Sequence, residues 1–239
     1  MSAQDYRSET LLGIGMTQHL DTYLSPQHYN GPELRVLTAS YIYGHDGRHQ
    51  KNWYTLLQHE GSMAMTEPKS ENASELSGSY RFAAGRLRTF VAQPHFRLSA
   101  GLLGELGVGF DYITRNTNNP AQARLSAAVV PALRLSYGFR LWQKTLVAGY
   151  NAQVPLVGVM FSPQYGQSYY EIFSRGNYDH NAVLTSAFAA PSLSHRLTLS
   201  IPFSRSSLTV GYLGDWRQAV PNDLKQHQYT HSIVIGWSR

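Results

Sequence analysis

The stretch that decides the fold runs from Phe96 to Tyr112 and reads FRLSAGLLGELGVGFDY. Every second position, starting at Phe96, holds an apolar residue or glycine, and the charges Arg97, Glu105 and Asp111 all fall on the positions between. A repeat of two is that of a β-strand, whose side chains alternate between two faces. Soluble strands typically have about five or six residues. A strand this long with one apolar and one polar face predicts a membrane barrel, with lipid outside and water inside.

The composition agrees with one β-barrel domain over residues 1–239. A length of 239 residues suits a single barrel, and the 42% of hydrophobic residues never form a run long enough for a membrane helix. The 16 tyrosines and 4 tryptophans fit the aromatic girdles of membrane barrels. With 0 cysteines the chain has neither a disulfide framework nor thiol chemistry. The net charge of +5 comes from scattered arginines, which excludes a nucleic-acid patch.

The first residues, MSAQD, have neither the basic segment nor the apolar core of a signal peptide. A barrel in an outer membrane must be exported. We therefore expect that a signal peptide has been removed, that residues 1–7 form a periplasmic tail, and that the protein lies in the outer membrane of a Gram-negative bacterium.

Ten strands are predicted from the alternation and from the turn residues between strands. They cover residues 8–19, 33–44, 51–64, 78–91, 96–112, 124–141, 145–161, an irregular segment within 178–203 interrupted by Pro191, 207–217 and 228–238. The connections alternate between long and short, beginning with a long loop at 20–32 and an Asp46-Gly47 hairpin. This predicts an all-β, antiparallel, up-and-down transmembrane barrel with short periplasmic turns and long extracellular loops.

Two predicted strands have less regular faces. In strand 33–44 we expect Leu37, Ala39, Tyr41 and Tyr43 to face lipid. In strand 78–91 the apolar residues change from even to odd positions, which predicts a β-bulge near Gly85. With that bulge Arg81, Arg86 and Arg88 all face the lumen, whereas an arginine facing lipid at mid-membrane costs about 2–4 kcal/mol.

A charge network is predicted inside the barrel, where ten strands leave little free width. Its members are Arg81, Arg86, Arg88, Arg97, Glu105, Asp111, Arg124, Arg134, Arg140, Asp215 and Arg217. We expect ion pairs and hydrogen bonds among them to plug the lumen. The excess of arginine leaves open a site for a small anion or a lipid phosphate.

The 10 histidines raise the question of a metal or hydrolase site. His45 and His49, and His227 and His231, are four apart, which on a strand separates them by about 13 Å, too far to share an ion. We predict no metal site and no cofactor, although the first pair could chelate if it lies in a turn. A Ser/His/acid site requires three converging groups; His231 is either an interfacial base or a histidine at headgroup level.

The most distinctive local sequence is the loop 161–175, FSPQYGQSYYEIFSR. Loops carry function more often than scaffolds do, and tyrosine is a favourable contact residue. Tyr165, Gln167, Tyr169, Tyr170 and Glu171 form a candidate outer-loop contact surface. The alternative is an aromatic cap folded over the mouth of the barrel.

The segments VPLVGVMFSP at 154–163 and YGQSYYEIF at 165–173 resemble an uncharacterised family of Bacteroidota outer-membrane proteins, a domain of unknown function. QDYR at 4–7, YLSP at 23–26 and NNPA at 118–121 also match its pattern. The resemblance implies an outer-membrane barrel and assigns no catalytic or binding residue. The final strand, with an aromatic residue at Trp237, resembles the signal read by the barrel-assembly machinery.

Three functions remain open, and catalysis is the less favoured. The first is a non-catalytic barrel, a structural or accessory subunit within a larger outer-membrane complex. The second is an enzyme acting on lipid or lipopolysaccharide, and the third is a narrow channel for anions or small solutes. The expected partners are outer-membrane lipid and lipopolysaccharide, the barrel-assembly machinery and other outer-membrane proteins, without nucleic acid. A soluble lipocalin-like barrel is the alternative fold.

Overall fold

The computed structural model describes residues 6–46, 49–70, 72–114, 120–141 and 143–239, with the backbone alone for residues 45, 46 and 49–51. Its elements are β1 (Tyr6–Asp21), β2 (Ser25–Asp46), β3 (His49–Pro68), β4 (Glu75–Ala92), β5 (Phe96–Ile113), β6 (Ala121–Leu141), β7 (Lys144–Gln153), β8 (Val157–Phe161), α1 (Tyr169–Phe173), β9 (Ala182–Ser186), β10 (Ser192–Pro202), β11 (Ser207–Ala219), η1 (Pro221–Asp223) and β12 (Gln226–Ser238). No helix in this part of the chain is long and apolar enough to cross a membrane.

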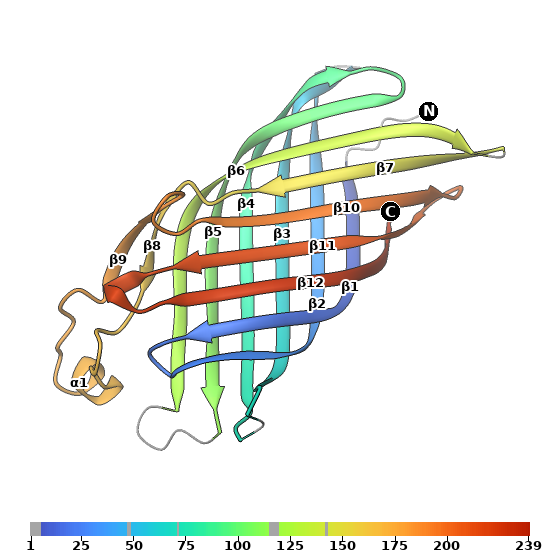
Figure 1. Ribbon diagram of the computed structural model, residues 1–239. Coiled ribbons are helices and arrows are strands. Elements are labelled where there is room, and N and C mark those ends of the chain that lie inside the picture. Colours follow the sequence, from blue (N-terminus) through green and yellow to red (C-terminus); the bar gives the residue numbers. More distant parts are fainter. Residues whose placement is uncertain (1–5, 47–48, 71, 115–119, 142) are drawn as a thin grey trace.

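The strands close into an antiparallel barrel (Figure 1). Around the wall the order is β1-β2-β3-β4-β5-β6-β7-β10-β11-β12, and β12 pairs with β1. β8 prolongs β7 along β6 beyond an interruption that contains Pro155, and β9 prolongs β10 beyond one that contains Pro191. The wall therefore has ten strand positions, which confirms the predicted up-and-down barrel.

The two ends of the barrel differ in their connections (Figure 1). At the turn end, which holds the start of β1 and the end of β12, residues 93–95 and 203–206 join neighbouring strands. At the loop end lie residues 22–24, 162–181 and 220–225, together with residues 69, 70, 72–74, 114 and 120. Of the predicted connections, Gly47, Arg48, residues 115–119 and Trp142 fall outside the described residues, as do the first five residues of the predicted tail.

β5 has the two faces that its sequence predicts. Leu102 on the outer face is 57% exposed, and its neighbour Leu103 on the inner face is 1% exposed. Glu105 and Asp111 are buried on the inner face as well. The outward positions 102, 106, 108 and 110 carry Leu, Leu, Val and Phe, so this wall presents an apolar surface of the kind that lipid covers.

The prediction for β2 was wrong in its choice of face. Leu37, Ala39 and Tyr41 are buried inside the barrel, whereas Leu34 and Val36 are exposed on the outer wall. The inside of this barrel contains an apolar layer, so a strand crossing it has apolar residues on both faces and its alternation is weak. That layer consists of Leu11, Leu37, Ala39, Tyr41, Tyr54, Leu56, Ala83, Leu87, Leu103, Val130, Ala132, Leu213 and Val234.

The predicted bulge at Gly85 was also wrong. Gly85 pairs in register with Leu103, and the shift in the β4–β5 ladder lies between Thr89 and Val91. Arg86 and Arg88 consequently face outward and are exposed. Their guanidinium groups lie 5.6 Å from the Trp53 ring and 5.5 Å from the Phe90 ring, respectively. These cation–π contacts near the turn end fit the aromatic interface of a membrane rather than its centre.

The loop predicted at 20–32 is in fact a three-residue turn, 22–24. Pro26 and Pro32 lie within β2, where the β2–β3 ladder passes from Asn30↔Glu67 to Glu33↔Ala64 without a pair at Pro32. Proline lacks the N–H that a ladder bond needs, and a strand tolerates it where such a bond is absent. The turn-forming composition of this segment therefore did not end the strand.

Candidate functional site

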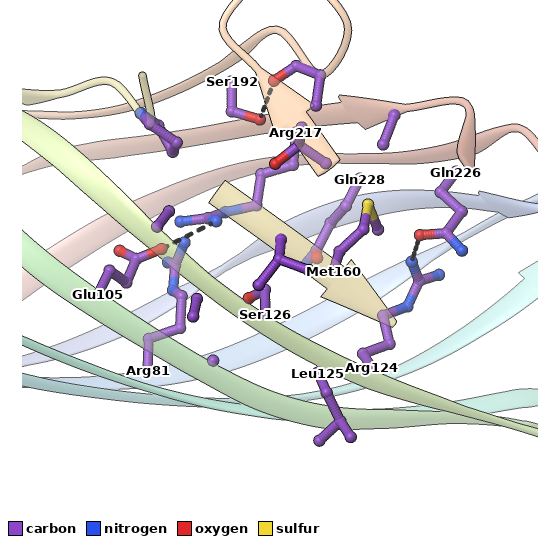
Figure 2. Close-up of a pocket in the computed structure, with 18 of the residues that line it drawn as sticks. Arg81, Glu105, Arg124, Leu125, Ser126, Met160, Ser192, Arg217, Gln226 and Gln228 are labelled. Atoms are coloured by element: carbon purple, nitrogen blue, oxygen red, sulfur yellow. Dashed lines mark hydrogen bonds and ion pairs between the residues drawn. The ribbon is translucent and has the colours of Figure 1, made fainter. Parts of the chain in front are cut away.

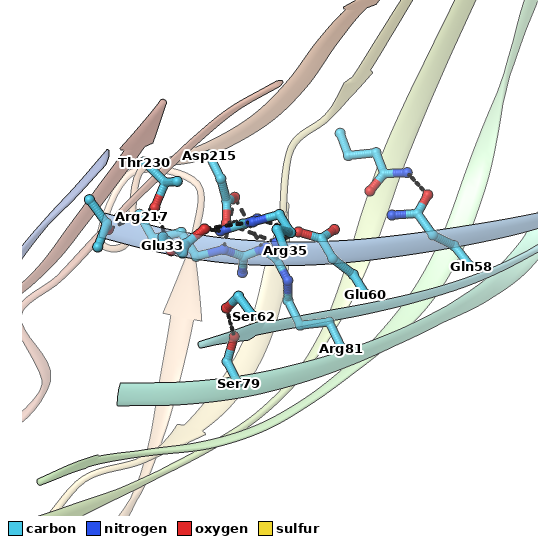
Figure 3. Close-up of polar contacts among 12 residues, drawn as sticks. Glu33, Arg35, Gln58, Glu60, Ser62, Ser79, Arg81, Asp215, Arg217 and Thr230 are labelled. Carbon is cyan, nitrogen blue, oxygen red and sulfur yellow. Dashed lines mark hydrogen bonds and ion pairs between the residues drawn. The ribbon is translucent and has the colours of Figure 1, made fainter. Parts of the chain in front are cut away.

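The middle of the lumen is crossed by ion pairs that join opposite walls (Figure 3). Arg81 on β4 donates to Asp215 Oδ2 on β11 at 2.8 Å and to Glu60 Oε1 on β3 at 2.5 Å. In the wall order, β4 and β11 are separated by five of ten steps, which is half the circumference. The Arg81–Asp215 pair is therefore a direct bond between opposite walls of the barrel.

Arg35 on β2 extends this central layer. Its guanidinium lies 2.7 Å from Glu33 and 3.0 Å from Asp215, and it also pairs with Glu60. Arg217 lies 3.2 Å from Asp215 and 3.3 Å from Glu105. Most of these groups are buried, and a buried charge is tolerated only with partners that replace its water.

A second polar layer lies nearer the loop end. Arg124 on β6 pairs with Asp111 and reaches Asp21 on the opposite wall, β1, at 3.1 Å. It also donates to Gln226 Oε1 at 2.8 Å. His19 and Glu75 complete the layer with a hydrogen bond of 2.8 Å.

The same layer brings together a group that could hold a metal ion. One ligand atom each from His19, Glu75 and Asp111 lies within 4.8 Å of the others, and all three residues are buried. β1 is far from β4 and β5 in the sequence, and Glu75 and Asp111 lie at the open end of the β4–β5 hairpin, so spacing could not reveal this group. Arg124 already neutralises Asp111, and His19 is bonded to Glu75. The His19 Nε2 atom is buried without a protein partner.

A lid, residues 162–181, covers the loop end and contains α1. The Tyr169 hydroxyl accepts from the Ala123 backbone N–H at 2.6 Å and donates to Gln122 at 3.0 Å, which fixes the lid to β6. The Tyr23 hydroxyl donates to the Gln167 carbonyl at 2.8 Å. Burial raises the pKa of Tyr23 to about 12 and also raises that of Tyr169, so both phenols stay protonated donors.

The candidate contact residues of this loop divide into two groups. Tyr165, at 86% exposure, and Tyr170 point into the surroundings. Gln167 is buried and bonded to Asn181 at 2.8 Å, and Tyr169 belongs to the attachment of the lid. Glu171 completes a capping box with Ser168, whose backbone N–H lowers the pKa of Glu171. The loop is thus an aromatic cap with an exposed outer surface.

A cavity of about 170 Å³ lies in the loop-end half, beside an interruption in the wall (Figure 2). Within the described chain β9 pairs on one side only, with β8, and the β10–β11 ladder ends at Ser192↔Arg217. The cavity has an apolar side with Val157, Met160 and Phe161 and a polar side with Arg217 and Gln226. The Gln226 side-chain nitrogen is buried without a protein partner.

The outer wall carries an aromatic cluster around His231. The Nδ1 atom of His231 and the Tyr212 hydroxyl are 2.5 Å apart, and the His231 ring lies 5.9 Å from the Trp216 ring. His195 packs against Trp216, with ring centroids 4.9 Å apart. In this cluster His231 contacts the Tyr212 hydroxyl and the rings of Tyr212 and Trp216. His45 and His49 are among the residues whose side chains are not described.

Six residues of the predicted lumen network enter the two polar layers, namely Arg81, Glu105, Asp111, Arg124, Asp215 and Arg217. Arg134 lies inside with its guanidinium 4.0 Å from the centre of the Tyr41 ring, Arg97 lines a cavity at the turn end, and Arg140 is exposed there. Arg86 and Arg88 are the two that lie outside the lumen. Sequence reasoning missed Glu33, Arg35 and Glu60, although Glu33 and Arg35 share the face of buried Tyr41 and could have been found from the correct face.

A family model described as "Protein of unknown function (DUF3316)" matches residues 2–239. No curated protein matches the chain. Among solved structures, the outer membrane protease OmpT from Escherichia coli is similar at 6% identity and a TM-score of 0.51, over 98% of this chain and 95% of that chain. At this identity the likeness shows the fold alone, that of an outer-membrane barrel.

Two autotransporter domains are also similar in shape. The transport unit of AIDA-I from Escherichia coli has 9% identity and a TM-score of 0.49, over 98% of this chain and 90% of that chain. The translocator domain of NalP from Neisseria meningitidis has 11% identity and a TM-score of 0.45, over 99% and 88%.

Proposed function

We propose that this chain, which belongs to the DUF3316 family, is a non-catalytic outer-membrane barrel with a structural or accessory role in a larger outer-membrane complex. It would lie in the outer membrane of a Gram-negative bacterium, with the turn end in the periplasm. The observation that carries the proposal is the set of ion pairs that cross the lumen from wall to wall, Arg81–Asp215 and Arg124–Asp21.

These contacts favour a structural barrel over a channel. Beneath the central layer lies the apolar layer, and the cavity beside it measures about 30 Å³, room for only a few water molecules. A passing solute would have to separate buried charges, and breaking a buried pair costs about 3–5 kcal/mol. A filled lumen supplies rigidity rather than a path.

The exposed side of the lid supports an accessory role. Tyr165, Tyr170, Phe173 and Tyr178 are all exposed there. Exposed aromatic residues that gather in one place mark contact surfaces. We expect them to meet another outer-membrane protein or the sugar of lipopolysaccharide.

Two measurements test this function. Planar bilayers with the purified barrel should show no conductance steps, and steps of a reproducible size would refute the filled lumen.

Cross-linking in membranes should capture a defined partner with the native chain and with Tyr6→Ser, an exposed tyrosine at the turn end. It should fail with the double variant Tyr165→Ser, Tyr170→Ser. Recovery of the native chain from its membranes as an uncross-linked monomer alone would contradict the accessory role.

A second function, binding of a membrane lipid, is favoured by the cavity at the wall interruption. Phe188 at 95% exposure and Leu184 stand beside this opening, where lipid would surround them. An acyl chain would enter along Met160, and an oxygen of its headgroup would accept from the unpartnered Gln226 amide. Native mass spectrometry should find a retained lipid that Met160→Trp removes and that Met63→Trp, an exposed outer-wall control, leaves in place. Equal retention by both variants would refute this function.

A further inference from the structure

The turn end of the lumen contains a cavity of about 480 Å³ that neither function uses. We call it the turn-end vestibule. It lies inside the barrel beneath the connection 93–95, and its wall includes Arg7, Glu9, Tyr54, Arg97, Arg134 and Ser136. The apolar layer separates it from the central ion pairs, because Tyr54 belongs to that layer and lines the vestibule as well.

The vestibule has more positive than negative groups. Glu9 is the carboxylate that lines it among the described side chains, and Glu9 is already bonded to Arg196 at 3.0 Å and to the Tyr41 hydroxyl at 3.2 Å. Arg7 donates to the Ser238 hydroxyl at 3.1 Å, and Arg134 lies over the Tyr41 ring. Within the described part of the chain, neither these two arginines nor Arg97 forms an ion pair with a carboxylate.

The charge balance in the vestibule follows directly. Among the described side chains that line the vestibule, Arg7, Arg97 and Arg134 give three positive charges, and Glu9, which is itself paired with Arg196, gives one negative charge. Guanidinium groups stay charged at any physiological pH, so this surplus cannot be relieved by losing protons. Arg7 and Arg134 are half-buried and Arg97 is exposed, and partly desolvated positive charges without a carboxylate partner favour the binding of an anion.

A buried hydroxyl provides a second and independent sign of a ligand. Tyr54 is 4% exposed, lines the vestibule, and its hydroxyl has no hydrogen-bond partner in the described protein. An unsatisfied buried donor costs about 1–3 kcal/mol. A ligand oxygen beside Tyr54 would satisfy this hydroxyl while its charge neutralises the arginines.

We propose that the turn-end vestibule binds a compact anion that carries a phosphate group. Three guanidinium groups and a hydroxyl offer more donors than the two oxygens of a carboxylate can accept, whereas a phosphate monoester has three free oxygens and close to two negative charges. The volume lies in the lower part of the range of ligand cavities, about 300–1,000 Å³. A phosphate group with a small organic substituent fits these limits.

This phosphate chemistry has two sources at the turn end, a soluble phosphate ester and a phospholipid headgroup. The proposal goes beyond the structural role and does not depend on it, because a barrel with a filled centre can bind a ligand at one end.

Calorimetric titration of the purified barrel in a neutral detergent at low salt tests the site. The probes are inorganic phosphate, glycerol 3-phosphate, and micelles that contain phosphatidylglycerol. A soluble source predicts binding of glycerol 3-phosphate, and a lipid source predicts binding of the phosphatidylglycerol micelles alone. Heat from none of the three probes would overturn the proposal.

Variants locate the binding. Arg97→Gln should weaken the affinity at least about tenfold, the effect of losing one hydrogen bond to a charged group. Tyr54→Phe removes the unpartnered hydroxyl and should also weaken binding, while leaving the unbound barrel at least as stable. Arg140→Gln is the matched control, an exposed arginine at the same end that does not line the vestibule. Equal affinities of the native chain and Arg97→Gln would overturn the proposal, even where binding itself is observed.

Discussion

The two halves of the lumen contain the same types of charged residue but differ in the ratio of arginines to carboxylates. On the loop-end side of the apolar layer, the ion-paired carboxylates outnumber the guanidinium groups by seven to four. The carboxylates are Glu33, Glu60, Glu105, Asp215, Asp21, Glu75 and Asp111, and the guanidinium groups are those of Arg35, Arg81, Arg217 and Arg124. On the turn-end side, the described lining of the vestibule has the three guanidinium groups of Arg7, Arg97 and Arg134 and the one carboxylate of Glu9. One half is therefore cross-linked by ion pairs, and the other has arginines without a carboxylate partner, where we propose that an anion binds.

The net charge of the whole chain hides this difference between the two halves of the lumen. A net charge of +5 describes neither half, because the surplus in the vestibule is offset by a deficit beyond the apolar layer. The apolar layer keeps the two sets of charges apart. Changes in each half should accordingly have different consequences.

The largest effect is expected from breaking a pair that crosses the lumen. Arg81→Met leaves Asp215 and Glu60 with fewer partners and should lower the free energy of unfolding by about 3–5 kcal/mol. Equilibrium unfolding in urea from lipid vesicles measures this. Arg86→Met on the outer face of the same strand is the control, with a loss below about 1 kcal/mol. Similar losses in both variants would show that Arg81 does not act as a cross-link.

The apolar layer should respond nearly as strongly. Leu103→Ala removes a buried side chain from the lumen and should cost about 2–5 kcal/mol. Leu102→Ala, one residue earlier on the outer wall, leaves no cavity in a packed core and should cost less than half as much. The same unfolding assay compares them. A larger loss for Leu102→Ala would reverse the assignment of the two faces of β5.

A smaller loss is expected where a hydroxyl supports the central layer. Thr230 donates to Glu33 at 3.0 Å and shares a bond of 2.8 Å with Thr17, both inside the barrel. Thr230→Val keeps the shape and removes both bonds, so stability should fall by about 1–3 kcal/mol. Thr10→Val, on the outer face of β1, should change stability little. An unchanged urea midpoint for Thr230→Val would contradict the support of Glu33 by this hydroxyl.

The smallest effect concerns the lid. Tyr169→Phe removes its bonds to Ala123 and Gln122, and we expect faster proteolysis within residues 162–181 with the barrel itself intact. Tyr165→Phe, whose side chain is exposed, should be cut at the native rate. Faster cutting of Tyr165→Phe than of Tyr169→Phe would exclude the attachment of the lid through Tyr169.

The sequence predicted correctly those strands whose outer face is apolar and whose inner face is mostly polar. In β5 and β6 the outward side chains are apolar and most inward ones are polar or small, Leu103 and Val130 being large apolar exceptions, so alternation alone predicted both strands and their faces. β2 crosses the apolar layer, and there Leu37 inside and Val36 outside look alike. The prolines Pro26 and Pro32 wrongly predicted a loop, because a strand tolerates proline where the ladder lacks a pair, as at Pro32.

The candidate site was predictable only in part for a different reason. Inward arginines could be identified on strands with regular alternation, but the carboxylates that pair with them could not. Asp215 lies 134 residues from Arg81, and only closure of the ten-stranded wall brings them together. The vestibule depends on which arginines lack a partner, which no local pattern reveals.

The most direct test of the sealed lumen uses the natural absence of cysteine in the chain. Ser136→Cys places a thiol in the vestibule, and Ser232→Cys places one at a buried position on the inner face of β12. A charged, water-soluble thiol reagent should modify the folded Ser136→Cys barrel rapidly and the Ser232→Cys barrel only after unfolding. Equally fast modification of both thiols in the folded protein would show an open, water-filled lumen and contradict the central claim.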